Sequence, residues 1–413
     1  MSNYIPATEL AVEDQGDSMF EHIVLRRAER GLPISAGQIA EALLYYQRLH
    51  IFIDRATLFQ LIKQIGASGV LTLLHRPEVS AVYCEEMLGT NTGSIGVSQH
   101  HNFVAFTLAG SKDGTQLKSP VERLHYELKR HDSGVDDPKK FSKQFLAKVP
   151  IRKFSGNHFL EGGITAAAMR DVLDIDFAKK ALRNVVGVTE GGYSIGENLK
   201  FEVIDTELGF YVFTDVDFPS INQRRAQATP PVEPLTIAHL LSSILEARAD
   251  LALASFYGGD FVTSAATSSI IRARHEELLR RTSINSDALQ HFSDVVLPDT
   301  PSLAEVIDSG ERSFSEFLKL LDRASRFKDW LKTVNPDENL VRTYMRDVSS
   351  EGWIQRLPAK SIRYVLTQAL DATYPAVGLV AGFVDNFFLE KLLAGWRPNH
   401  FVTGKLSQFV QVK

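Results

Sequence analysis

The clearest β signal in the chain is the stretch Leu199-Lys200-Phe201-Glu202-Val203-Ile204-Asp205-Thr206-Glu207-Leu208-Gly209-Phe210-Tyr211-Val212-Phe213-Thr214. Two runs rich in β-branched and aromatic residues, 199–204 and 210–214, flank a short loop that ends in glycine. Such runs around a short glycine-containing loop are typical of a β-hairpin. The sequence therefore predicts two paired antiparallel strands here.

The chain changes character soon after this hairpin. The segment Thr229-Pro230-Pro231-Val232-Glu233-Pro234 is rich in proline, which lacks a backbone N–H and continues neither a helix nor a central strand. We therefore place a linker at 229–234. The predicted fold class is α+β, with a mixed domain over 21–228, an all-helical domain over 235–413 and a flexible segment over 1–20.

The amino-terminal domain is predicted to contain both helices and strands. Glu21 to Leu74 is expected to be helical, because apolar residues recur there at three- and four-residue steps. Short β-rich runs predict strands, and a run of Gly, Asn and Thr predicts a loop between them. The strands are Ser80–Cys84 and Phe103–Leu108, the loop is Gly89–Gly96, and further helices are expected at Pro120–Arg130 (capped by Ser119), Pro138–Ala147 and Ile164–Leu173.

Helix-start signals dominate the carboxyl-terminal domain. Ser313-Phe314-Ser315-Glu316 matches the capping box and predicts one helix over Ser313–Lys332. A second start is expected at Asn335-Pro336-Asp337-Glu338. The run 309–330, with Trp396-Arg397-Pro398-Asn399, resembles bacterial proteins of unknown function over at most a quarter of the chain, and this resemblance implies no activity.

Composition places the chain among soluble globular proteins. Hydrophobic residues make up 44% and charged residues 23% of the 413 residues, and the net charge of -5 argues against a surface built wholly for nucleic acid. A local basic patch remains compatible with this charge. The lone Cys84 excludes an intrachain disulfide and, with no secretion signal at the amino terminus, favours the cytoplasm.

The segment Ala372–Val384 is apolar but too short for a membrane span, and Pro375 interrupts it. Phe387, Phe388 and Leu389 follow it. We expect no transmembrane segment. For Ala372–Leu389 we favour a buried core helix, then a surface for a partner subunit, and last a membrane-active segment.

Few residues suggest chemistry. His100 and His101 follow the predicted loop, and adjacent histidines on a strand point to opposite faces, which favours an exposed pair without a special role. Other weak candidates are an acid-x-Lys pair on a predicted helix and a histidine with a nearby carboxylate. These are Glu127 and Lys129, and His158 and Glu161.

A glycine pair offers a weak anion site. Gly162 and Gly163 precede a predicted helix that contains Thr165, so backbone amides at the helix start could attract an anion. The lysine and Ser/Thr that end a phosphate-binding loop are missing. No cofactor and no metal site are predicted.

Two functions remain open. The first is a non-enzymatic bacterial cytoplasmic protein that acts as a binding or regulatory subunit, with a protein partner or a second copy bound through the helical domain. The alternative is a metal-dependent phosphodiesterase, nuclease or nucleotide-processing enzyme, for example in antiviral defence. An enzyme would bring polar residues such as His158 and Glu161 together in a pocket, whereas a binding protein would expose an apolar patch.

Overall fold

The computed structural model describes residues 20–28, 31–96, 98–107, 111–112, 115–190, 193, 195–207, 209–228, 232–274, 276–298, 300–334, 340–341, 343–344 and 397–411. The chain is mixed α/β, and its carboxyl-terminal region is largely helical. Its contacts form two compact units. The larger unit comprises 22–286 and 302–319, and the smaller one comprises 1–21, 287–301 and 320–413. The domain division predicted at 229–234 stays a prediction.

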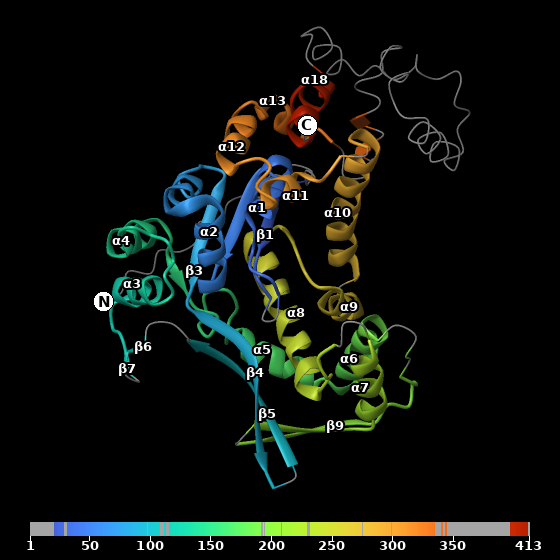
Figure 1. The fold of residues 1–413 in the computed structure, drawn as a ribbon. Coiled ribbons are helices and arrows are strands. Elements are labelled where there is room, and N and C mark those ends of the chain that lie inside the picture. Colours follow the sequence, from blue (N-terminus) through green and yellow to red (C-terminus); the bar gives the residue numbers. More distant parts are fainter. Residues whose placement is uncertain are drawn as a thin grey trace, which may run out of the picture. The chain divides into compact units, whose positions relative to one another are not determined.

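A parallel five-stranded sheet lies at the centre of the larger unit (Figure 1). Its strands are β1 (His22–Leu25), β2 (Arg48–Ile53), β3 (Val79–Cys84), β8 (Ile151–Arg152) and β11 (Asp260–Phe261), in the order β11-β1-β2-β3-β8. Helix α1 (Ala36–Tyr45) connects β1 to β2, and α2 (Arg55–Leu73) connects β2 to β3. Parallel strands need such crossovers.

The parallel sheet corrects one prediction and confirms another. Residues 22–25 and 48–53 are strands, so the expectation of helix throughout 21–74 was wrong there. Strands buried on both faces are nearly continuous apolar runs, and such short runs have no period that separates strand from helix. The predicted strand 80–84 is confirmed, with Cys84 buried at its end.

An antiparallel sheet of four strands adjoins the parallel one. Its order is β4 (Glu86–Ile95), β5 (Ser98–Thr107), β10 (Gly209–Thr214) and β9 (Phe201–Thr206). The predicted hairpin is therefore confirmed as β9–β10. The predicted loop Gly89–Gly96 was wrong, because β4 runs to Ile95. Gly93 faces the ring of His100 so closely that a Cβ there would lie 2.4 Å from it, which explains a glycine within a strand.

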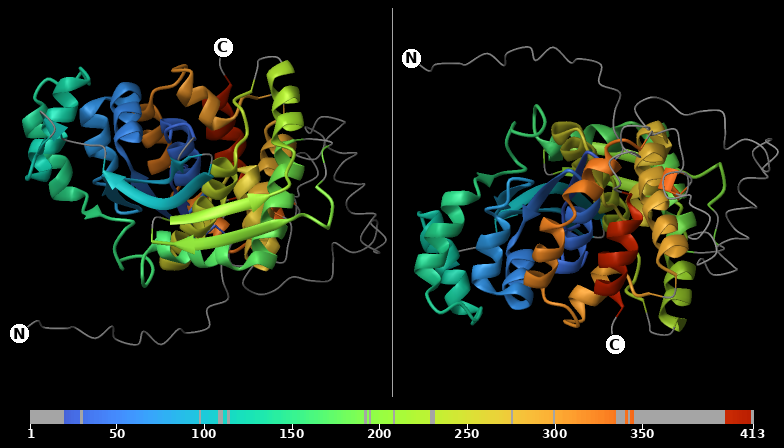
Figure 2. Two further views of the ribbon diagram at one scale, coloured as in Figure 1. Left: turned by 90° about the horizontal axis from the view of Figure 1, so that it is seen from below. Right: turned by 90° about the horizontal axis from the view of Figure 1, so that it is seen from above.

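Helices cover one face of this antiparallel sheet, as both views of Figure 2 show. They are α5 (Ile164–Leu173), α6 (Ile175–Thr189) and α8 (Ile237–Tyr257). Helix α8 packs against strands of both sheets, namely β1 and β4. Its Leu240, Leu245 and Leu253 belong to a core shared with Phe201 and Phe210 of the hairpin. One continuous core thus joins the two sheets.

The larger unit contains further helices and two further short strands. Predicted helices at 120–130, 138–147 and 164–173 are confirmed as α3 (Pro120–Arg130), α4 (Pro138–Lys148) and α5, although the Ser119 side chain does not cap α3. The others are α7 (Phe218–Gln227), α9 (Ala265–Arg274), α10 (Glu276–Val296), which continues into the smaller unit, and α11 (Leu303–Asp308). Strands β6 (Ser111–Lys112) and β7 (Thr115–Gln116) form a two-stranded sheet. Strand β11 shows that the region after 234 is not all helical.

The predicted helix over 313–332 is interrupted. Its capping box is confirmed, because the Ser313 N–H donates to Glu316 at 2.9 Å and the Glu316 N–H donates to the Ser313 hydroxyl at 3.2 Å. However, two residues separate the end of α12 (Phe314–Asp322) from the start of α13 (Ser325–Leu331). Because of this break, the aromatic residues of 313–332 lie on two helices rather than along one face of a single helix.

The smaller unit has an aromatic core. Phe327 stacks on Trp330 and on Phe401, and Phe292 meets Tyr344 edge to face. Phe401 ends α18 (Asn399–Phe401), which is followed by the π-helix η1 (Val402–Leu406) and by α19 (Ser407–Val410). The flexible segment predicted at 1–20 lies outside the described residues except for Phe20, and so do Asn335–Glu338 and Ala372–Leu389. Within the described ranges, every helix is too short or too polar to cross a lipid bilayer.

Candidate functional site

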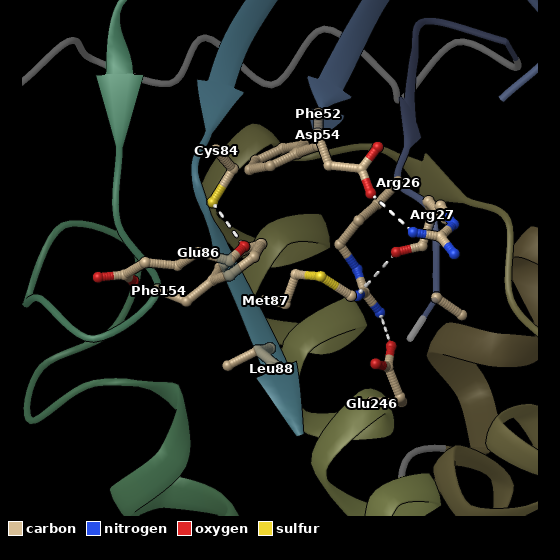
Figure 3. A pocket seen from close by; sticks show the side chains of 11 residues that line it. Arg26, Arg27, Phe52, Asp54, Cys84, Glu86, Met87, Leu88, Phe154 and Glu246 are labelled. Atoms are coloured by element: carbon tan, nitrogen blue, oxygen red, sulfur yellow. Dashed lines mark hydrogen bonds and ion pairs between the residues drawn. The ribbon is translucent and has the colours of Figure 1, made fainter. Parts of the chain in front are cut away.

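Two small hollows that share Arg27, Asp54 and Met87 lie at the carboxyl ends of strands β1, β2 and β3, and we describe them together as one cleft. Each strand is followed directly by charged residues, namely Arg26 and Arg27, Asp54 and Arg55, and Glu85 and Glu86. In sheets of this type, ligands bind at the carboxyl ends of the strands. Figure 3 shows the walls of this carboxyl-edge cleft, which include Phe52, Met87 and Leu88.

Arg26 anchors the floor of the cleft to helix α8. Its guanidinium forms an ion pair with Glu246 and donates to one Asp250 oxygen from Nε at 3.1 Å and from Nη2 at 2.7 Å. The Arg26 side chain is only 7% exposed. Burial alone would lower the pKa of Arg26, but the two carboxylates outweigh it and raise that pKa. Burial raises the pKa of Asp250, which Arg26 opposes.

Asp54 and Arg55 lie at the start of helix α2. Asp54 caps this helix by accepting from the Thr57 N–H at 2.7 Å, and its other oxygen accepts from Arg27 at 3.0 Å. Arg55, the first residue of α2, donates to Glu127 of α3 at 2.9 Å. Arg27 and Arg55 therefore line the cleft at a helix amino terminus, where backbone dipoles favour negative charge.

Two further carboxylates follow β3. Glu85 holds Arg123 through two hydrogen bonds, of 2.8 and 2.6 Å. Glu86 accepts from the hydroxyl and the N–H of Ser155, and in Figure 3 its side chain points away from the hollow. Burial raises the pKa of the Cys84 thiol to about 12, so this thiol remains protonated and is a poor nucleophile at neutral pH.

The arginine side chains at the cleft thus form ion pairs with carboxylates. Each of Arg26, Arg27, Arg55 and Arg123 has a carboxylate partner. A buried ion pair holds its elements in place and is costly to break. The arrangement therefore fixes α2, α3 and α8 on the sheet edge, and it offers a ligand only the remaining donors of Arg27 and Arg55.

The predicted histidine pair lies on β5 and not on an exposed loop, so that expectation was wrong. His101 is buried on the helix-covered face and its Nδ1 lies 2.9 Å from the Thr92 hydroxyl. Burial, together with His100, lowers the pKa of His101. His100 points to the opposite face and packs against Tyr211, with ring centroids 5.8 Å apart. The two side chains therefore do not act together.

The other predicted site residues are dispersed. Glu127 is 1% exposed, bonded to Arg55 and 3.4 Å from His131, while Lys129 is exposed on the same helix. His158 and Glu161 are exposed, and His158 packs against Phe256. Partial desolvation and then Arg152 lower the pKa of His158. Only Glu127 adjoins the cleft, through its bond to Arg55.

The amides of the two glycines in the predicted anion site have partners within the chain. The Gly162 N–H donates to the Asn157 side chain at 3.2 Å, and the Gly163 N–H donates to the Leu160 carbonyl at 2.9 Å. Both glycines have φ near +80°, so the pair makes a turn that other residues would strain. Thr165 lies in the first turn of α5. Turn geometry therefore accounts for the two glycines.

Comparisons with protein families, with curated proteins and with solved structures find no match. In the described ranges, no three His, Cys, Asp or Glu side chains are placed to hold a metal ion together. The site must therefore be interpreted from its own geometry.

A second candidate site is the outer face of the antiparallel sheet. The strand register puts several large apolar side chains on the side opposite α5, α6 and α8. Three of them are about half exposed: Ile95 (53%), Ile204 (51%) and Phe213 (50%). Figure 2 (left) views this side, and no described helix lies in front of β9 and β10. We call these residues the outer sheet face: Ile95, Val104, Phe106, Ile204, Tyr211 and Phe213.

Sequence reasoning missed this face although the signal was present. In the predicted hairpin, Ile204, Tyr211 and Phe213 alternate with the core residues Val203, Phe210 and Val212. Both faces of these strands are therefore apolar, whereas a strand with one solvated face alternates apolar and polar residues. This departure from alternation marks a face that is suited to contact another molecule.

Proposed function

We propose that this protein is a non-enzymatic binding protein that holds another protein against the outer sheet face. The observation that supports the proposal is that half-exposed Ile95, Ile204 and Phe213 share the side of a four-stranded sheet that no described helix covers. Large apolar side chains that share a face are typical of interaction surfaces, whereas single exposed ones are ordinary. Dispersal of the predicted catalytic residues agrees with this function.

The contact surface differs from the one first expected. The segment Ala372–Leu389, for which a buried core helix was the first prediction and a partner surface the second, lies outside the described residues. Binding through that segment, to a partner or to a second copy, stays a prediction, as does a cytoplasmic location. The outer sheet face supports the binding function independently of that segment.

Substitution of the outer sheet face tests the proposal. The double variant Ile204→Thr/Phe213→Thr places at both positions a residue that is common in strands but polar, so the fold should persist and binding should fall at least tenfold. The protein is purified gently from its host, and co-purifying proteins are measured by native mass spectrometry. Val262→Thr is the matched control, because Val262 is equally exposed (51%) and lies outside this face.

The two outcomes are distinct. Loss of one co-purifying protein from the double variant, with retention by Val262→Thr, supports the proposal. Recovery of the same proteins with both variants, or purification of the wild type without any partner, contradicts it. Circular dichroism confirms that each variant is folded.

A nucleotide-processing enzyme is the second candidate, favoured by the location of the carboxyl-edge cleft. Arg27 and Arg55 line it at the amino terminus of α2, where a phosphate would gain from both charge and dipole. If this function holds, Arg55→Gln should weaken the binding of nucleoside phosphates at least tenfold, measured by calorimetry. The exposed Arg48→Gln is the control. Equal binding by wild type and Arg55→Gln would remove this candidate.

A further inference from the structure

We propose that the partner contributes an extended strand that pairs with the free edge of β9, and that this strand presents a basic-apolar-apolar-basic pattern. The inference rests on the proposed function and specifies the chemistry of the partner. Three features of β9 support it: its edge position, its charges and its exposed apolar residue.

Strand β9 forms one edge of the antiparallel sheet. It pairs with β10 on one side, and among the described residues every hydrogen bond of 201–206 runs to β10. An edge strand presents unpaired N–H and C=O groups, which can accept another strand. Binding by strand addition uses these groups for affinity and the neighbouring side chains for specificity.

The edge is acidic. Glu202, Asp205 and Glu207 are exposed within six residues, and no described basic side chain forms an ion pair with them. Lys200, which precedes the strand, is the only basic residue between 196 and 214. Opposite charges across neighbouring strands stabilise pairing, and like charges oppose it.

The negative charge of the β9 edge favours some binding partners over others. Two copies of β9 placed edge to edge would bring their carboxylates together, so self-pairing is disfavoured. A nucleic acid would meet the same repulsion through its phosphates. A basic segment of another protein gains from the same carboxylates.

The strand register defines the pattern. Glu202 and Ile204 point to the outer face, while Val203 and Asp205 point to the helix-covered face. A paired strand would therefore place basic residues opposite Glu202 and Asp205, and apolar residues opposite Val203 and Ile204. Phe213 lies diagonal to Ile204 on the outer face and can extend the apolar contact. The pattern reads the same in both strand directions.

A synthetic peptide tests the inference. The acetylated and amidated peptide Thr-Lys-Val-Val-Lys-Thr is titrated into the full chain, with the matched peptide Thr-Glu-Val-Val-Glu-Thr as control. We expect the basic peptide to bind at least tenfold more tightly at low salt, to lose affinity as salt rises, and to slow hydrogen exchange of the β9 amides. Binding is measured by fluorescence anisotropy, and exchange by mass spectrometry.

A charge-reversal variant makes the test specific. Glu202→Lys/Asp205→Lys changes two exposed side chains, so the fold should persist, and it should prefer the acidic peptide instead. Equal binding of both peptides, an unchanged preference in the variant, or no binding of the basic peptide would overturn strand addition. The proposed function would survive that failure if the outer-face variant still lost its co-purifying partner.

Discussion

Replacing Arg26 by methionine is expected to lower the free energy of unfolding of the larger unit by about 3–5 kcal/mol. The guanidinium of Arg26 lies between the buried carboxylates of Glu246 and Asp250, which belong to a helix more than 200 residues away in the sequence. Methionine retains much of the side-chain volume but leaves two carboxylates without this partner. An uncompensated buried charge is more costly than the loss of a surface ion pair.

Urea unfolding measures this effect. All three tryptophans lie in 320–413, so tryptophan fluorescence follows the smaller unit, and far-UV circular dichroism follows both units. The variant should shift the dichroism transition and leave the fluorescence transition in place. Arg48→Ala is the control: Arg48 is exposed and donates to the Pro77 carbonyl, and its loss should cost under about 1 kcal/mol.

The stability of the Arg26→Met variant should depend on pH, and it should fall as pH increases. Burial already raises the pKa of Asp250, and removing Arg26 takes away the charge that opposes this rise. A raised carboxyl pKa in the folded state means that the folded state binds more protons, so stability falls as pH increases. The difference between Arg26→Met and wild type should therefore shrink at pH 5 relative to pH 8. A difference that is constant, or larger at pH 5, would show that the lost interaction is not electrostatic.

Removing all three charges gives a further control. Arg26→Met/Glu246→Gln/Asp250→Asn keeps similar volumes and leaves no carboxylate at this position. We expect it to recover much of the stability lost in Arg26→Met, because the buried charge is gone. If the triple variant is as unstable as the single one, packing of the arginine stem is the main contribution.

Local patterns predicted local structure well. The hairpin at 199–214 was recognisable because two β-rich runs flank a short loop, and three helices were recognisable from proline or glycine at their starts. Strands β1 and β2 were not, since their few apolar residues lie beside helical patterns and only pairing with neighbours determines their state. An element could be predicted where the contacts that determine its structure are close in sequence, and not where those contacts are distant.

The candidate sites depend on distant contacts. Nothing near Arg26 indicates that its partners are Glu246 and Asp250, and nothing near Glu85 indicates Arg123. The outer sheet face is different, because the sequence of the hairpin itself shows that both faces of its strands carry apolar residues. What the sequence alone could not show is that the described helices cover one side of the sheet and leave the apolar side chains of the other side partly exposed.

The second large effect is expected at Gly37, where α1 meets α11. A Cβ at this position would lie 2.4 Å from the Ala304 carbonyl oxygen and 2.7 Å from the Ala304 Cα. These are backbone atoms, which cannot rotate aside as a flexible side chain can. Gly37→Ala should therefore push the two helices apart and destabilise the larger unit by about 1–3 kcal/mol.

The loss should extend beyond the steric contact. The Gly37 N–H donates to Asp308 at 2.9 Å, the Ala304 N–H donates to Glu41 at 3.0 Å, and Gln64 also donates to Asp308. These bonds tie residues 302–319 to α1 and α2, although more than 240 residues separate them in the chain. Separation of the helices would weaken all three bonds, so hydrogen exchange within 302–319 should accelerate in the variant.

Gly187→Ala is the matched control for this prediction. Gly187 is an exposed residue in the last turn of α6, where an added Cβ meets no atom within 4 Å. Alanine is the better helix former, so this variant should be more stable than wild type by about 0.5–1 kcal/mol. The two Gly→Ala changes thus have opposite expected signs in the same unfolding experiment. Equal effects would mean that α11 can move away from α1 at little cost, and that residues 302–319 pack less tightly on α1 and α2 than their contacts indicate.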